Sequence, residues 1–105
     1  MNLALIIGNA EREIERLSRR HCSDAEVFSF GATDIDPRHL AIWITTKTDR
    51  DRDRFRANRV LISEFRTVLL NLGYPPAAVP NVGFAFESKE TVDRDHGGNW
   101  WYAIK

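Results

Sequence analysis

The stretch Ser88-Lys-Glu-Thr-Val-Asp-Arg-Asp-His-Gly-Gly-Asn-Trp-Trp-Tyr-Ala-Ile104 decides how the fold of this 105-residue chain is interpreted. It joins a charged segment with two glycines to three consecutive aromatic residues, Trp100 to Tyr102. Large aromatic side chains at a terminus cost free energy when water surrounds them, so the segment should be tied to a core or to a partner. We interpret Asn99–Ile104 as the last strand of the fold and Lys89–Gly98 as the loop that leads into it.

Three further strands are predicted from the alternation of residues between two faces. They lie at Val27–Ala32, Leu40–Lys47 and Val82–Ser88. Turn residues fill Thr33–His39 between the first two strands, which favours a hairpin. A rigid connector at Pro75–Pro80 precedes the third.

Two helices are predicted from apolar stripes at spacings of three and four. The first runs from Leu3 to at least Leu17, although Gly8 weakens it and Asn9 could be its true start. The second covers Asp49–Leu72, beginning after an N-cap at Thr48 and ending before Gly73.

The predicted order of elements is α-β-β-α-β-β, a single α+β domain over residues 1–105. Moving the last strand to the front gives the split βαβ order of ferredoxin-like folds. We therefore expect a circularly permuted ferredoxin-like fold, with a four-stranded antiparallel sheet and two helices on one face. Leu40–Lys47 and Asn99–Ile104 would be its central pair, so that deleting Trp100–Lys105 would abolish cooperative unfolding.

The charge composition disfavours some classes of partner. Lysine and arginine together number 15, as do aspartate and glutamate, so the formal net charge is zero. Nucleic acid is therefore an unlikely partner, because domains that bind it typically have a high pI and a basic stripe. Cys22 is the only cysteine, which excludes an internal disulfide and fits a reducing compartment. No apolar run approaches the roughly 20 residues of a membrane span, so we expect a cytoplasmic protein without membrane association.

Aromatic residues of the sheet could form a partner site. Trp43 and Trp101 should share the face that lies away from the helices. Trp and Tyr supply much of the binding energy at protein interfaces, which favours a docking surface there. Packing between neighbouring strands accounts for the same residues about equally well.

The Lys89–Gly98 connection is the second candidate, because about ten residues is long for a hairpin that normally turns in two to five. It carries four polar residues, Glu90, Asp93, Asp95 and His96. They could contact a partner, bind the backbone of their own loop, or form an acid/base or metal site. No calcium template fits and no second histidine lies nearby in the sequence, so we expect neither metal nor cofactor.

The tract Asp49-Arg-Asp-Arg-Asp-Arg54 opens the second predicted helix. Its charges recur three residues apart, which predicts the local ion pairs Asp49–Arg52, Asp51–Arg54 and Asp53–Arg56. We interpret the tract as a solvated first turn that complements the helix dipole. The alternative is a patch of arginines, extended by Arg56 and Arg59, that binds phosphate or a partner.

The ending Glu87-Ser-Lys-Glu-Thr-Val-Asp-Arg-Asp, followed by Gly98-Asn-Trp-Trp-Tyr, resembles the ending of a set of small uncharacterised bacterial proteins. This resemblance implies a bacterial origin. Some single-domain proteins of this size act as immunity partners of contact-dependent or polymorphic toxins, so the resemblance also suggests an immunity protein. Many immunity proteins against nucleases are acidic, whereas this chain is neutral, which disfavours a nuclease as the toxin.

Three functional hypotheses follow. The leading one is a non-enzymatic protein-interaction module, an immunity protein that neutralises a toxin through the open sheet face and the 89–98 loop. The second is a module that stacks RNA or single-stranded nucleic acid on the sheet aromatics. The third is a small enzyme that uses His96 with Asp93 or Asp95. Homodimer formation through the sheet face competes with all three.

Overall fold

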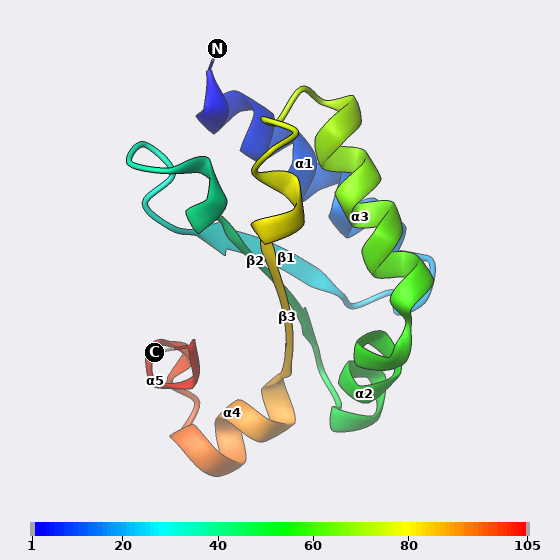
Figure 1. The fold of residues 1–105 in the computed structure, drawn as a ribbon. Helices are drawn as coiled ribbons and strands as arrows, with labels where there is room; N and C mark the ends of the chain where they lie inside the picture. The colour runs from blue at the N-terminus through cyan, green and yellow to red at the C-terminus, as the bar shows by residue number, and fades with distance from the viewer. Residues whose placement is uncertain (1, 105) are drawn as a thin grey trace.

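The structure is a computed structural model that describes residues 2–104. Figure 1 shows a small twisted sheet with helices at its back and at one end. Its strands are β1 (Glu26–Phe30), β2 (Ala41–Thr46) and β3 (Gly83–Ser88). The helices are α1 (Leu3–Arg19), α2 (Asp49–Ala57), α3 (Arg59–Asn71), α4 (Lys89–His96) and α5 (Trp100–Ile104). Two short 3-10 helices, η1 (Pro37–His39) and η2 (Val79–Asn81), precede β2 and β3.

The sheet has the order β1-β2-β3 and is mixed. β1 pairs antiparallel with β2, as the predicted hairpin requires, whereas β3 runs parallel to β2. The α+β class is confirmed, but the expected four-stranded antiparallel sheet and its permuted ferredoxin-like order are wrong. The parallel pair arises because α2 and α3 form a crossover that returns the chain to the end of the sheet where β2 began.

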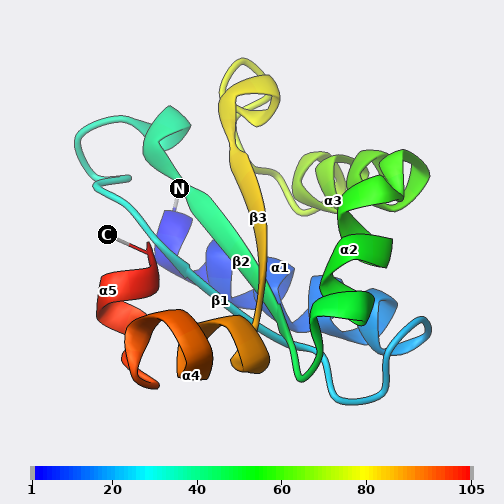
Figure 2. The ribbon, with the colours of Figure 1, turned by 90° about the horizontal axis from the view of Figure 1, so that it is seen from below.

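Helices α1, α2 and α3 lie against one face of the sheet. Figure 2 looks onto the other face, with α1 behind the strands. Ile42 and Ile44 of β2 are fully buried on the covered face. Phe55 of α2 stacks on Phe86 of β3 with ring centroids 5.7 Å apart. The core is completed by Ala10, Ile14, Leu61, Phe65, Leu69, Tyr74 and Val82.

The first helix extends through Gly8 instead of beginning after it. Asn2 is its N-cap, and the Asn2 side chain accepts a hydrogen bond from the Leu5 amide at 3.2 Å. Ala10 and Ile14 are fully buried, which confirms the predicted apolar stripe. No helix within residues 2–104 is long and apolar enough to cross a membrane.

Asn58 divides the predicted long helix into α2 and α3. Its backbone is not helical (φ −92°, ψ 81°), and its side chain accepts from the Leu61 amide at 3.1 Å. Asn58 is therefore both the end of one helix and the N-cap of the next, a role for which asparagine is well suited. The predicted N-cap at Thr48 is confirmed, and α3 ends at Asn71, just before the positive-φ residue Gly73.

The C-terminal segment is helical where a loop and a strand were predicted. Ser88 caps α4 by accepting from the Thr91 amide at 3.1 Å, and Gly97 ends it in the left-handed conformation (φ 58°). Asn99 then accepts from the Trp101 amide at 3.0 Å at the start of α5. Local caps thus determine this segment. A central strand is excluded as well, because β2 already has a neighbour on each side.

Candidate functional site

Three stacked rings lie on the sheet face opposite α1, α2 and α3; we call Phe28, Phe30 and Trp43 the aromatic array. The ring centroids of Phe28 and Trp43 are 6.2 Å apart and their planes differ by 2°. Phe30 lies 6.3 Å from Trp43 in a similar orientation. The register places Phe28 directly opposite Trp43, and side chains two residues apart share a face, which brings Phe30 alongside.

Helix α5 adds aromatic surface beside the array. Trp100 meets Phe28 edge-on, with ring centroids 6.3 Å apart and an interplanar angle of 84°. Trp101 and Tyr102 are 65% and 60% exposed, and no residue of α5 is buried. A cavity of about 250 Å³ lies where α5 approaches the sheet, lined by Glu26, Phe28, Thr45, Lys89 and Trp100.

The structure only partly assembles the predicted contact residues. Trp43 belongs to the array, on the predicted face. Trp101 was expected on the same sheet face but lies on α5, exposed to solvent. The remaining four belong to helix α4 instead of a loop: Glu90, Asp93, Asp95 and His96.

These four polar residues do not converge on one point. The Glu90 carboxylate accepts from the Asp49 amide at 3.4 Å, and Asp95 pairs with Arg94 at 3.1 Å. In the described part of the chain, no hydrogen bond or ion pair joins His96 to Asp93 or Asp95. The His–Asp pair that acid/base catalysis would require is therefore not formed here.

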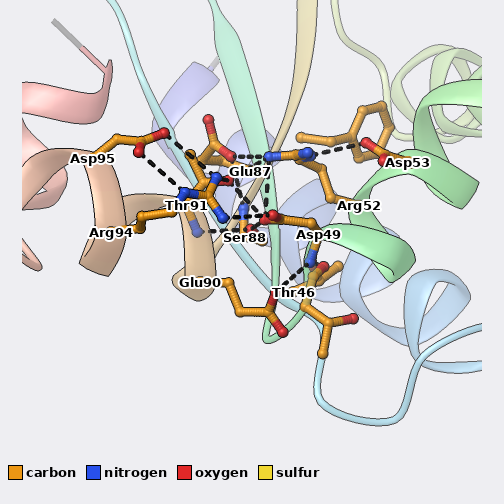
Figure 3. A network of polar contacts seen from close by, with 12 residues as sticks. Thr46, Asp49, Arg52, Asp53, Glu87, Ser88, Glu90, Thr91, Arg94 and Asp95 are labelled. Atoms are coloured by element: carbon orange, nitrogen blue, oxygen red, sulfur yellow. Dashed lines mark hydrogen bonds and ion pairs between the residues drawn. The ribbon is translucent and has the colours of Figure 1, made fainter.

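Asp49 is the centre of a polar network at the end of the parallel strands, shown in Figure 3. Its carboxylate accepts from the hydroxyl of Ser88, from that of Thr91 at 2.6 Å, and from Arg94 at 3.0 Å. These donors, together with the charge of Arg52, hold the pKa of Asp49 well below its usual range. The network fastens the first turn of α4 to the first turn of α2.

Arg52 occupies the inner part of this network. Its guanidinium donates to Glu87 at 3.0 Å and to Thr91 at 2.6 Å, and its side chain is only 14% exposed. The predicted pair Asp49–Arg52 is present at 3.4 Å. The other two predicted pairs, Asp51–Arg54 and Asp53–Arg56, are not formed among residues 2–104. Arg52 is therefore a structural residue and not part of a phosphate-binding patch.

The sequence holds a signal for this network that the predicted loop and strand did not take into account. Thr46-Lys-Thr-Asp49 and Ser88-Lys-Glu-Thr91 each place a hydroxyl N-cap at the end of a strand. When neighbouring parallel strands end in such caps, the two helices begin at the same edge of the sheet and their first turns meet. Phe28 and Phe30 were not predicted as site residues either. The predicted hairpin would have indicated them, because pairing with the strand of Trp43 places both side chains on the same sheet face as Trp43.

Cys22, Asp24 and Asp51 are a group of described side chains whose ligand atoms could converge on a metal ion, since they lie within 4.8 Å of one another. Burial and the hydrogen bond to Asp24 raise the pKa of the Cys22 thiol to about 11. A thiol that keeps its proton is a poor nucleophile. Arg20 and Arg54 line the adjoining cavity of about 420 Å³, and their charges oppose a cation. We therefore assign no metal to this group.

Comparison with known proteins identifies no relative: no family model, no curated protein and no solved structure matches this chain.

Proposed function

We propose that this protein is a non-enzymatic protein-binding module whose partner docks on the aromatic array and α5. The observation that carries the proposal is the array: stacked rings on a sheet face that α1, α2 and α3 leave uncovered, beside the exposed Trp101 and Tyr102. Contiguous apolar surface of this kind marks interaction sites, and Trp and Tyr are enriched among the residues that dominate binding energy.

The partner is a folded bacterial toxin domain, and the protein acts as its immunity partner. The resemblance of the chain's ending supports this choice. The rings are held at fixed positions by strand pairing, so that little conformational entropy is lost when a rigid partner docks. Exposed Asp93 and Asp95 of α4, with the half-buried His96, supply a polar rim of the kind that surrounds apolar interface centres.

Charge near the array favours a protein over nucleic acid. Single-strand binders combine stacking rings with a positively charged groove that follows the phosphates. The cavity between the array and α5 is lined instead by one acid and one base, Glu26 and Lys89. Arg52 is committed to Glu87 and Thr91, and is not free to contact a phosphate.

The proposal is tested with the protein products of genes adjacent to its own, each titrated against the purified protein by calorimetry. In the complex that forms, Phe30→Ala and Trp101→Ala should each weaken binding at least tenfold, which is about 1.4 kcal/mol. Val60→Ala is the matched control, because Val60 is 70% exposed on α3, a helix that packs on the covered face of the sheet. Circular dichroism establishes that each variant is folded.

Two outcomes would contradict the proposal. One is equal affinity of the wild type and both ring variants for the bound gene product. The other is salt-dependent binding of oligonucleotides that both ring substitutions abolish, which would assign the same face to nucleic acid.

A further inference from the structure

Side chains of the helices contact the backbone at both edges of the sheet. At the β1 edge, side chains of α1 reach round to the backbone: Glu15 accepts from the Val27 amide at 3.1 Å. Arg19 donates to the Ala25 carbonyl at 2.9 Å. Unpaired edges invite a further strand, and native proteins usually cover them. The β1 edge is covered in this way.

At the β3 edge, side chains bond the two ends of the strand, and among the described residues no side chain bonds the backbone of Phe84. The Gly83 amide donates to the Leu40 carbonyl at 3.0 Å, so Gly83, Ala85 and Glu87 direct their backbone groups toward β2. By alternation, the amides and carbonyls of Phe84 and Phe86 point away from the sheet. Two arginines reach this edge: Arg56 donates to the Phe86 carbonyl at 2.8 Å, and Arg66 donates to the Val82 carbonyl at 3.1 Å.

A cavity of about 310 Å³ lies along this edge, between β3 and the junction of α2 with α3. We call it the β3 groove. One wall continues the sheet face opposite α1, α2 and α3 and carries Trp43, Ala85 and Glu87, while the other carries Ile62, Phe84 and Phe86. The groove is therefore continuous with the aromatic array through Trp43. A strand placed in it would direct alternate side chains to the two walls, as the pleat requires.

We propose that an extended segment of the partner adds to β3 as a fourth strand, and this inference rests on the proposed function. The backbone of Phe84 and Phe86 supplies the hydrogen bonds, and the two apolar walls select alternate apolar side chains. Arg56 lines the groove and has no carboxylate within 4.0 Å among the described residues. The segment therefore carries an acidic residue that pairs with Arg56 once the guanidinium leaves the Phe86 carbonyl.

The test uses a library of random short peptides displayed on phage, selected against the folded full-length protein. Selected peptides are synthesised and added to isotopically labelled protein for amide-exchange measurements by NMR. Exchange at Phe84 and Phe86 should slow at least tenfold at saturation, while Val27 and Ser29 at the opposite edge stay unchanged. The peptides should share alternate apolar positions and one acidic residue.

Backbone methylation of a selected peptide provides the control. A strand bonds to its neighbour through every second amide, so methylating one alternate set should abolish binding while methylating the other leaves it intact. The inference is overturned if both methylated peptides bind equally, if Phe84 and Phe86 gain no protection, or if selection yields no binder. If instead the adjacent-gene product still depends on Phe30 and Trp101, the proposed function stands without strand addition.

Discussion

At the scale of single residues, Asp49 links parts of the chain that are distant in sequence. It begins α2, yet its carboxylate is held by Ser88, Thr91 and Arg94 at the other end of the crossover. Asp49→Asn should lower the midpoint of thermal unfolding at about pH 7. The neutral amide loses the attraction of Arg94, and its NH2 group cannot accept a hydrogen bond from the donors that hold the carboxylate. Glu64→Gln, on the exposed side of α3, should leave the midpoint unchanged.

The effect of Asp49→Asn should depend on pH in a definite direction. The pKa of Asp49 is lowered on folding from its ordinary value of 3.8, so ionised Asp49 stabilises the folded state. This contribution is fully present above about pH 5 and is lost as the pH falls below about 4 toward the lowered folded pKa. The difference between the wild type and Asp49→Asn should therefore shrink at about pH 3. A difference that stays constant down to that pH would contradict the assignment.

Gly31 is required by its backbone conformation and by its surroundings. Its φ is +136°, and a Cβ placed there would lie 2.1 Å from the His39 carbonyl oxygen. Gly31→Ala should lower the free energy of unfolding by about 3 kcal/mol or more, since both the backbone strain and the overlap must be relieved. Gly83→Ala is the matched control, because a Cβ there meets nothing within 4 Å, and should change stability by less than about 0.5 kcal/mol. Urea denaturation measures the free energy of unfolding of both variants. Similar losses of stability in the two would contradict the explanation.

At the scale of elements, α5 should be dispensable for folding. It has no buried residue, and Trp100 at its start meets Phe28 of the sheet edge-on. A chain that ends at Asn99 should therefore unfold cooperatively, with a loss of at most about 1–2 kcal/mol from that contact. This reverses the expectation from the sequence, in which the same residues formed a central strand.

Val92→Ala provides the comparison for the truncation. Val92 lies on α4 and is fully buried, so the substitution should cost roughly 1–3 kcal/mol while removing far fewer atoms. Thermal unfolding followed by circular dichroism compares Val92→Ala with the chain that ends at Asn99. A broad, non-cooperative transition for the truncated chain would show that α5 is part of the core after all.

The elements that the sequence predicts well are those with local signals. Thr48 and Gly73 mark helix ends through bonds and backbone angles confined to a few residues, and the alternation around Ile42 marks a buried strand. Asn58 carries a cap signal of the same kind, but the apolar stripe on both sides of it favours an unbroken helix. The five aromatic and apolar residues after Asn99 fit a strand as well as a helix. The hydrogen bond from the Trp101 amide to the Asn99 side chain favours the helix.

Strand direction and partner surface depend on the whole chain, and here the sequence is less informative. Alternation shows which face of a strand is buried and does not show whether its neighbour runs parallel or antiparallel, so the β2–β3 pair could not be derived from Val82–Ser88 alone. For the site, alternation correctly placed Trp43 on the sheet face opposite α1, α2 and α3. The meeting of Asp49 with Ser88 required the parallel order, and was therefore missed.

At the scale of the whole molecule, the β3 groove adjoins the sheet face opposite α1, α2 and α3, and the two meet at Trp43. Glu15 and Arg19 bond the backbone at the β1 edge, whereas Arg66 and Arg56 bond the two ends of β3 and leave the backbone of Phe84 between them without a side-chain bond among the described residues. A second copy of the chain is the partner most readily available to an uncovered edge. Arg56 should therefore keep the free protein from pairing with itself.

Arg56→Ala should increase self-association of the protein when no partner is present. The substitution removes the donor to the Phe86 carbonyl and a charge from the β3 groove, and both changes favour pairing between two β3 edges. Light scattering over a concentration series should show a higher apparent mass for this variant than for the wild type. Arg54→Ala removes an equal charge from the same helix without uncovering the edge, and should behave as the wild type does. If both variants associate equally, the loss of net charge causes the self-association, and Arg56 does not specifically prevent pairing at the β3 edge.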